Sequence, residues 1–345
     1  HNKNLFKYPI GVIMFDQKIK KAQSYIKKTY PKISTPDLSY FILFSPRSGS
    51  NFLATSLEKA GLGHPVEAFS GNPNARQRRN WGIDYSDPAI YMETAISKQL
   101  TNGSMGMKMN SIQFKVFLHT ARQLLGKDFE DLTDPEVTEV FFPKLKFIHI
   151  QRKKKVKQAI SLAKALQNGI WTEEEGQDTE YKKFLLPTVY DRDHIECCFD
   201  DSLSMDIFWQ HYLRKNDLPY LPIFYEDLAA NYSEKMKEVF AFLGIKNTPV
   251  PSPKLRKQSN QQSENWEERF IAETPWLKDP EIIRAYDSGD LESLYCLRCR
   301  MIISGRENAR WRTMPANRYK KIRKFAFNLK RKLFGFFTRG ESISS

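Results

Sequence analysis

Strand-like and helix-like stretches alternate between residues 38 and 250. Short, mostly apolar runs occur at 40–44, 105–109, 145–150 and 220–224, and the first of them is rich in aromatic and β-branched residues. After each run, apolar residues recur every three or four positions, as they do on one face of a helix. Strands that alternate with helices at this spacing predict an α/β fold whose central sheet is mostly parallel and flanked by helices.

The pattern divides the chain into four parts. Helices are expected at 88–99, 110–125, 203–215 and 232–243. Residues 1–37 mix lysines with aromatic residues and are expected to form an N-terminal arm before the main domain at 38–272. Residues 273–316 are expected to form a helical extension packed on that domain, and 317–345 a basic amphipathic tail.

The first strand stops at the sequence Ser-Pro-Arg-Ser-Gly-Ser, residues 45–50, and a helical pattern begins at once. In this order the free N–H groups of residues 48–51 point out of the helix N-terminus, where they and the helix dipole favour an anion. Gly49 would let the backbone approach that anion closely, and Arg47 would add a planar fork of donors. The stretch is therefore interpreted as a phosphate-binding loop.

This loop differs from the loop of nucleoside triphosphatases, which ends in a lysine and a Mg²⁺-binding hydroxyl. Asn51 and Phe52 follow the turn instead. The alternative is that the Ser/Gly turn only caps a helix.

A second basic turn follows the strand at 145–150, where Gln151, Arg152 and three lysines precede the next helix. Arg152 and Ser161 are nine residues apart, so on one continuous helix they would lie on opposite sides. To share a ligand with Ser161, Arg152 must stand in the strand-to-helix turn. The alternative is that this basic run is a solvated face.

Candidate proton acceptors lie in the irregular segment that follows the first helix. His64 and Glu67 occur there, among Gly, Pro and Asn residues, at the edge of the sheet where α/β proteins bind ligands. Lys108 would leave the end of the second strand near the same loop. For each of them the alternative is an ordinary surface residue.

A basic polar segment begins at residue 251 and ends in a helix start near residue 270. Its Arg256 and Lys257 could fold over an anionic ligand with Trp266 as the anchor. An exposed linker is the alternative interpretation.

The net charge of +14 favours acidic partners, which could be a polyanionic cofactor, an anionic membrane or nucleic acid. The four cysteines are few for 345 residues and are interpreted as free thiols in a reducing compartment rather than as a zinc site, so no metal is expected. No apolar run approaches the ~20 residues that span a bilayer. Because the chain starts at His1 without a methionine, we expect it to be a trimmed product.

Residues 317–339 carry nine Lys and Arg residues and no acid, with apolar residues at helical spacing. This is typical of a basic amphipathic helix on an anionic membrane surface. A helix docked on the domain and a disordered tail are the alternatives. Nucleic-acid binding is not expected, because no recognition module is present. The expected location is the cytoplasm, with peripheral contact at the inner membrane surface, and a homodimer is left open.

Four segments together resemble a known family: PRSGSNFLATSLEKAG, GHPVEAF, IHIQRKKKVKQAISLAKALQNGIW and LRKQSNQQSENWEERF. In this order and spacing they resemble the bacterial carbohydrate sulfotransferases typified by mycobacterial trehalose sulfotransferase, which use 3′-phosphoadenosine 5′-phosphosulfate (PAPS). The resemblance covers residues 38–272 and implies a P-loop-like sulfotransferase fold. It also implies release of adenosine 3′,5′-bisphosphate and an acceptor hydroxyl on a glycolipid, oligosaccharide or polysaccharide.

The resemblance assigns roles position by position. It implies that Glu67 is the general base. Arg47, Lys108 and His64 are the other catalytic candidates, because of their expected positions near the same loop. The residues that it implies hold the donor are Arg47, Ser48, Gly49, Ser50, Asn51 and Phe52 at the 5′-phosphosulfate, Arg152 and Ser161 at the 3′-phosphate, and Arg256, Lys257 and Trp266 in a closing loop.

Two positions depart from the family pattern. Asn51 stands where these enzymes usually have Thr, and Ala68 replaces an aromatic residue of the acceptor-site wall. Sulfuryl transfer needs a base, cations on the leaving phosphate and positioning, but no metal. Because an ordinary carboxylate is a weak base for an alcohol, we expect burial or a lack of nearby cations to raise the pKa of Glu67. A phosphotransferase on the same loop and a non-catalytic anion- or membrane-binding protein are the alternatives.

Overall fold

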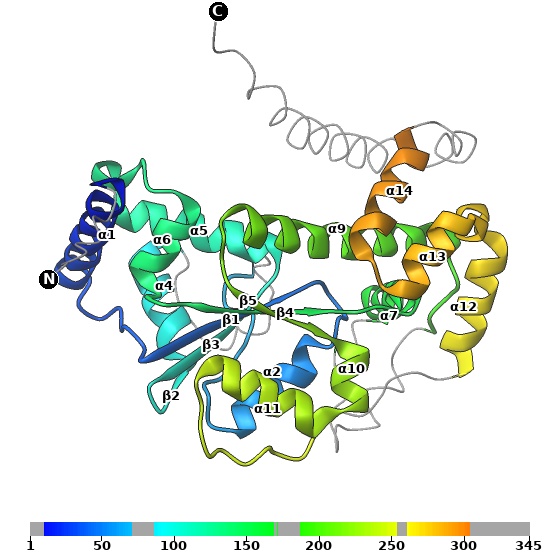
Figure 1. Cartoon of the computed structure of the whole chain (residues 1–345), viewed down its shortest axis with the longest axis horizontal. Coiled ribbons are helices and arrows are strands. Elements are labelled where there is room, and N and C mark those ends of the chain that lie inside the picture. Colours follow the sequence, from blue (N-terminus) through cyan, green and yellow to red (C-terminus); the bar gives the residue numbers. More distant parts are fainter. Residues whose placement is uncertain (1–9, 71–85, 169–170, 172–186, 254–260, 304–345) are drawn as a thin grey trace, which may run out of the picture. The chain divides into compact units, whose positions relative to one another are not determined.

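The computed structural model describes residues 10–70, 86–168, 171, 187–253 and 261–303 (Figure 1). The chain divides into two compact units, His1–Glu273 and Thr274–Ser345. The strands are β1 (Leu38–Phe44), β2 (Leu100–Thr101), β3 (Ser104–Met109), β4 (Lys146–Gln151) and β5 (Tyr220–Phe224). The helices of the first unit are α1 (Ile10–Thr29), α2 (Ser50–Lys59), α4 (Pro88–Ser97), α5 (Ser111–Leu125), η1 (Lys127–Phe129), α6 (Asp134–Phe141), α7 (Lys155–Asn168), α9 (Arg192–Lys215), α10 (Tyr225–Ala230), α11 (Tyr232–Leu243) and α12 (Gln261–Glu273).

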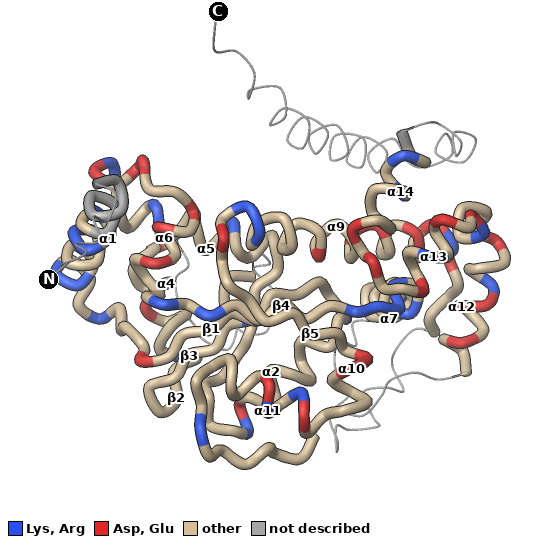
Figure 2. Tube along the Cα trace, viewed as in Figure 1, with Lys and Arg blue, Asp and Glu red and all other residues tan. Residues whose placement is uncertain are grey.

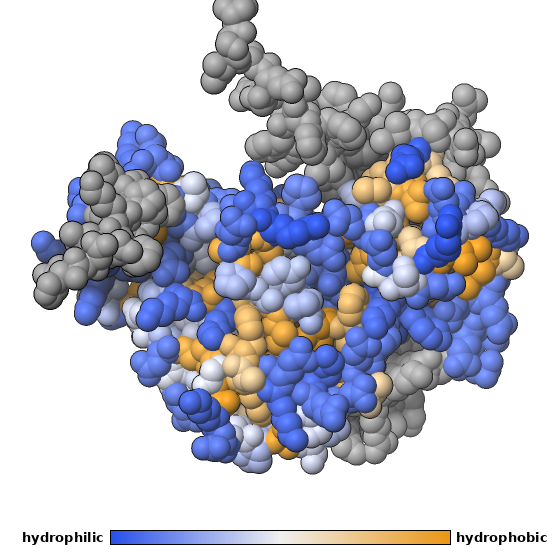
Figure 3. Space-filling view, in the orientation of Figure 1, coloured by the Kyte–Doolittle hydropathy of each residue, from blue (hydrophilic) through white to orange (hydrophobic). Residues whose placement is uncertain are grey.

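A five-stranded sheet in the order β2-β3-β1-β4-β5 forms the centre of the first unit. β3, β1, β4 and β5 run parallel, and only the two-residue β2 is antiparallel to its neighbour. The predicted α/β fold with a mostly parallel sheet is therefore confirmed. Pro222 lies in β5, the edge strand, where its missing N–H breaks no ladder. Figure 3 shows apolar residues reaching the surface in the middle of the face where Figure 1 draws β5.

Helices cover both faces of the sheet, because side chains of β1 alternate between two cores. Phe41 and Leu43 belong to a core completed by β3, α1, α4, α5, α6 and the end of α9. Tyr40, Ile42 and Phe44 belong to a second core completed by β4, β5, α2, α10 and α11. Figure 1 shows α5, α6 and α9 on one side of the strands and α2, α10 and α11 on the other. β1 is thus buried on both faces, as its continuous apolar run requires.

Several elements differ from the sequence-based prediction. The expected N-terminal arm contains the helix α1, whose buried Ala22 and Ile26 pack against the core of α5 and α6. α9 begins at Arg192 rather than at residue 203, because Ile195, Phe199 and Ser202 are buried at helical spacing although charged residues surround them. A short helix, α10, follows β5 directly and was not predicted. β2 and α6 were not predicted.

The second unit contains η2 (Pro275–Lys278), α13 (Pro280–Ser288) and α14 (Leu291–Ile303). Its Arg298 guanidinium lies 4.2 Å from the centre of the Trp276 ring. The predicted C-terminal helices are present as far as residue 303, and their packing on the main domain stays a prediction. The tail at 317–345 lies outside the described residues. No helix in the described part of the chain is long and apolar enough to cross a membrane.

One close contact in the sheet gives a test of the fold. The Tyr40 ring lies over Gly106, so that a Cβ atom at position 106 would come within 2.3 Å of the Tyr40 ring. Gly106→Ala should therefore lower the free energy of unfolding by about 1–3 kcal/mol through overpacking. Urea denaturation measures the loss, and Gly106→Ala combined with Tyr40→Leu should recover part of it. An unchanged midpoint in the single variant would contradict this packing.

Candidate active site

Four turns come together at the carboxyl edge of the sheet, because β1, β3, β4 and β5 run parallel and end there. They are residues 45–49 after β1, Asn110 after β3, residues 152–154 after β4 and Tyr225 after β5. Residues distant in sequence can therefore act on one ligand.

The turn after β1 is shaped as an anion cradle. Arg47 and Gly49 both have positive φ angles, of 65° and 93°. Gly49 is the N-cap of α2, and no side chain accepts the first N–H groups of that helix. The Ser48 hydroxyl is buried and has no hydrogen-bond partner in the described part of the chain. A buried donor without a partner beside uncapped N–H groups fits an anion.

Gly49 also makes a contact with Tyr225 that was not predicted. A Cβ atom at this position would lie 2.4 Å from Cδ2 of Tyr225, so the missing side chain makes room for the Tyr225 ring. Phe52, predicted to bind the donor, packs its ring against Tyr225 and Tyr232, at 6.5 and 5.3 Å between ring centres. Its side chain thus stabilises the first turn of α2, and only its backbone belongs to the cradle.

Arg47, Arg152 and Ser161 meet although 114 residues separate the first from the last. Arg47 Nε donates to Ser161 Oγ at 2.8 Å, and its Nη1 donates to the carbonyl of Trp171. Arg152 stands in the turn between β4 and α7, which is the position it needs in order to share a ligand with Ser161. Its Nη1 donates to the Arg47 carbonyl at 3.4 Å. The two basic turns therefore form one surface that can bind an extended anion.

Glu67 lies at the other side of the cradle and is held by two donors. Lys108 Nζ donates to Glu67 Oε1 at 2.8 Å and also to the amide oxygen of Asn51 in α2. Gln113 Nε2 donates to Glu67 Oε2 at 2.8 Å. The Lys108 side chain is buried, whereas the Glu67 side chain is 35% exposed. The carboxylate is thus oriented by protein donors and still open to a ligand.

The prediction that the pKa of Glu67 is raised was wrong in direction. Burial by itself would raise the pKa of this carboxyl, but the charge of Lys108 and the hydrogen bonds from Lys108 and Gln113 outweigh it and hold the pKa below its ordinary value. The error arose because the sequence does not show that Lys108 reaches Glu67.

The structure separates His64 and Trp266 from this group. His64 Nδ1 lies 2.7 Å from Oε1 of Glu58 on α2, with both side chains half exposed. Trp266 is buried under the Lys164 ammonium and against the Tyr190 ring, so it packs α12 onto α7. Arg256 and Lys257 lie outside the described residues. Ala68, assigned above to the acceptor wall, is buried in the core of α4 and α5.

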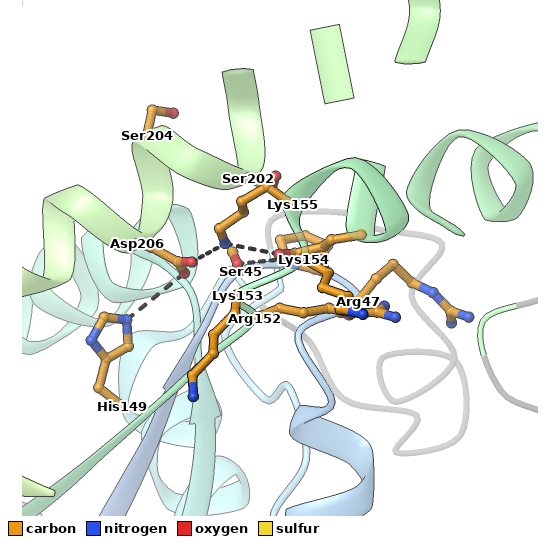
Figure 4. A network of polar contacts seen from close by, with 12 residues as sticks. Ser45, Arg47, His149, Arg152, Lys153, Lys154, Lys155, Ser202, Ser204 and Asp206 are labelled. Atoms are coloured by element: carbon orange, nitrogen blue, oxygen red, sulfur yellow. Dashed lines mark hydrogen bonds and ion pairs between the residues drawn. The ribbon is translucent and has the colours of Figure 1, made fainter. Parts of the chain in front are cut away.

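A buried polar network lies directly behind the cradle and was not predicted (Figure 4). Gln158 Nε2 donates to Ser45 Oγ and to the Pro46 carbonyl, both at 2.8 Å. Lys155 Nζ donates to Gln158 Oε1 at 2.8 Å and to Asp206 Oδ2. Because Lys155 occupies the acceptor of the amide, the amide donor of Gln158 must face the loop.

The ion pair in this network is fully enclosed. Lys155 and Asp206 side chains are both 0% exposed, and His149 Nε2 lies 3.8 Å from Asp206 Oδ1. The pKa of Lys155 is lowered, because the effect of burial is larger than the opposing effect of Asp206. The pKa of Asp206 is also lowered, because Lys155 and His149 together outweigh burial, which would raise it. Lys155, one of the three lysines in the basic run after β4, is thus a core residue, although a solvated face was the alternative interpretation of that run. The available signal was Asp206, an acid on the apolar face of α9.

Comparison with known proteins agrees with this architecture. The family model described as Stf0 sulphotransferase matches residues 39–273. Two proteins named trehalose 2-sulfotransferase are similar to the chain. The one from Mycobacterium tuberculosis is 26% identical, over 70% of this chain and 97% of the relative. The one from Mycolicibacterium smegmatis is 25% identical, over 67% and 94%.

Among solved structures, the sulfotransferase domain of the Synechococcus PCC 7002 olefin synthase is 15% identical with a TM-score of 0.31. The match covers 70% of this chain and 97% of that domain. The match of the family model over residues 39–273 shows that the chain belongs to the Stf0 sulphotransferase family. This confirms the resemblance identified from the four segments.

Among the residues that the structure describes, no group of three or more His, Cys, Asp or Glu side chains could hold a metal ion. The cysteines within this part of the chain form no disulfide bond.

The enclosed ion pair predicts a large penalty for removing one partner. Asp206→Asn should lower the free energy of unfolding by about 3–5 kcal/mol, because it leaves the Lys155 charge buried without its counter-ion. The double variant Lys155→Met with Asp206→Leu should lose less free energy of unfolding than Asp206→Asn alone. Lys153→Met is the matched control: it breaks the half-exposed pair with Asp227 and should cost about 1 kcal/mol or less. Additive losses in urea denaturation would show that Lys155 and Asp206 are not coupled.

The contacts of Glu67 predict how its carboxyl titrates. Heteronuclear NMR, with Glu67→Gln to assign the signal, should give a midpoint below that of an ordinary glutamate. Lys108→Met should move this midpoint upward, because the largest lowering influence is then removed while burial remains. Lys115→Met, at an exposed lysine on α5, is the control and should leave it unchanged. A titration in Lys108→Met that equals the wild-type one would rule out this pairing as the cause.

Proposed function

We propose that this chain transfers the sulfuryl group of PAPS to a hydroxyl of a carbohydrate. The observation that carries the proposal is the position of Lys108, whose ammonium group contacts both the Glu67 carboxylate and Asn51 of the anion cradle. A proton acceptor and an anion site are thereby joined by one buried cation. This is the arrangement that in-line transfer of a charged group to a hydroxyl needs.

The residues present fit the donor at both of its charged ends. Ser48, the N–H groups that begin α2 and Arg47 would hold the 5′-phosphosulfate, since they offer a buried unpaired hydroxyl and uncapped donors. Arg152 and Ser161 would hold the 3′-phosphate. When bound, PAPS supplies the sulfuryl group and leaves as adenosine 3′,5′-bisphosphate.

Glu67 is proposed as the general base. Its lowered pKa keeps the carboxylate ionised at neutral pH, so it is in the form that accepts a proton. Because such a carboxylate is weakly basic, it would take the proton of the acceptor hydroxyl as the oxygen becomes positive in the transition state. Lys108 and Arg47 would offset negative charge on the leaving phosphate.

The acceptor class is inferred from the relatives. Both carry the name trehalose 2-sulfotransferase, which specifies a sugar hydroxyl. Since Ala68 is buried rather than part of a wall, it does not argue for a different acceptor. We therefore propose a carbohydrate, free or as part of a glycolipid. Cytoplasmic location, membrane contact through 317–339 and a homodimer stay predictions.

The proposal is tested by ligand binding and by product analysis. Adenosine 3′,5′-bisphosphate should raise the melting temperature, and mass spectrometry should detect sulfated products from PAPS with trehalose or other sugars. Glu67→Gln should lower turnover by roughly 10²-fold or more, with bisphosphate binding retained, because only the proton acceptor is lost. His64→Gln, at the residue paired with Glu58, is the control and should keep turnover.

Other results of the binding assay would indicate a different function. Stabilisation by ATP with Mg²⁺ in place of the bisphosphate would indicate a phosphotransferase. Stabilisation by neither nucleotide would indicate a non-catalytic anion-binding protein.

A further inference from the structure

The first turn of α10, residues 225–227, contacts both basic turns of the site. On one side, the Tyr225 ring fills the space beside Gly49 and packs against Phe52, so it lies against the anion cradle. On the other side, the same ring lies 5.1 Å from the guanidinium carbon of Arg152. One aromatic side chain thus contacts the cradle and the arginine of the second turn.

Glu226 binds the second turn through its backbone. Its Oε2 accepts from the Lys153 N–H at 3.0 Å, and its Oε1 accepts from the Lys154 N–H at 3.1 Å. The same Oε1 lies 3.7 Å from Arg152 Nε. The carboxylate therefore satisfies two donors at the start of α7 and faces the guanidinium of Arg152.

Charge is concentrated where these segments meet. Figure 2 shows basic residues at the beginning of α7 and acidic residues at the beginning of α10. Figure 4 shows Arg152 and Arg47 extending side by side, whereas Lys153 points away from them. Asp227 pairs with the Lys153 side chain, at 2.8 Å to Nζ. Within one turn, Glu226 thus orients the arginine of the site, and Asp227 contacts a lysine that points elsewhere.

These contacts make the relative position of the two basic turns depend on α10. The β1–α2 turn contacts Tyr225, and the β4–α7 turn contacts Tyr225 and Glu226, so the first turn of α10 packs against both basic turns. A ligand with two anionic groups can bind both turns at once only if the separation of the turns matches the separation of its anionic groups.

We propose that Glu226 and Tyr225 are positioning residues that set the separation of the two anion subsites and so select nucleotides that carry a 3′-phosphate as well as a 5′-phosphate. This inference rests on the proposed function, because that function identifies the ligand as a nucleotide with two separated anionic groups. Glu226 itself would repel a phosphate, so it acts through Arg152 and the backbone of residues 153–154.

Calorimetry with adenosine 3′,5′-bisphosphate and with adenosine 5′-monophosphate tests the inference. The readout is the ratio of the two dissociation constants, because a general loss of stability would weaken both nucleotides alike. Glu226→Gln replaces one acceptor oxygen with an amide donor that faces a backbone N–H or Arg152. We expect it to lower the preference for the bisphosphate by roughly 10-fold or more, the effect of losing hydrogen bonds to a charged group.

Asp227→Asn is the matched control, since it removes the neighbouring carboxylate of the same turn. It should keep the wild-type preference to within about twofold, as expected for a half-exposed pair. Melting temperatures of both variants report on folding. If Glu226→Gln does not fold, Tyr225→Leu takes its place, because it removes the ring between Gly49 and Arg152 and leaves the carboxylate; it too should lower the preference.

The outcomes separate the two proposals. A wild-type protein without preference for the bisphosphate would overturn the proposed function and this inference with it. A clear wild-type preference that survives in the variant tested would overturn the inference alone. An equal loss of affinity for both nucleotides would do the same, since it would assign Glu226 a purely structural role.

Discussion

The parallel pairing of β1 between β3 and β4 is the constraint on which the site depends. It brings the turns that follow these strands to one edge of the sheet, and β5 adds a further turn on the outside. Because β1 is buried on both faces, its register cannot shift by one residue without moving Phe41 and Tyr40 into the wrong cores. The hydrophobic cores therefore also bring the turns that carry Arg47 and Arg152 to neighbouring positions on that edge.

Within this frame, each basic side chain of the site is held by a partner. Lys108 is paired with Glu67, Lys155 with Asp206, and Arg152 lies beside Glu226. These pairs orient the cations before any ligand is present, which lowers the entropy cost of ordering their side chains when a ligand binds. The pairs differ in exposure, and the difference separates their roles. Lys155 and Asp206 are enclosed behind the cradle, whereas the side chain of Glu67 is partly open.

The order of elements was predictable from the sequence, because each strand is short, apolar and followed by a helical period. The predictions failed where polar residues interrupt that period. The first half of α9 is rich in charge, so its buried residues Ile195, Phe199 and Ser202 did not show as an apolar period, and the helix was predicted to begin only at residue 203. α1 contains many lysines and was interpreted as an arm for the same reason.

The sequence by itself determined the class of fold and the family, along with the two turns that carry Arg47 and Arg152, since these depend on local periodicity and on short ordered motifs. Only the tertiary structure decided which charges meet. Lys108 comes from 41 residues away to lower the pKa of Glu67, and Glu226 from more than 70 residues away to contact the β4–α7 turn. Electrostatic effects depend on distances in space and on burial, and neither is encoded in the local pattern of residues.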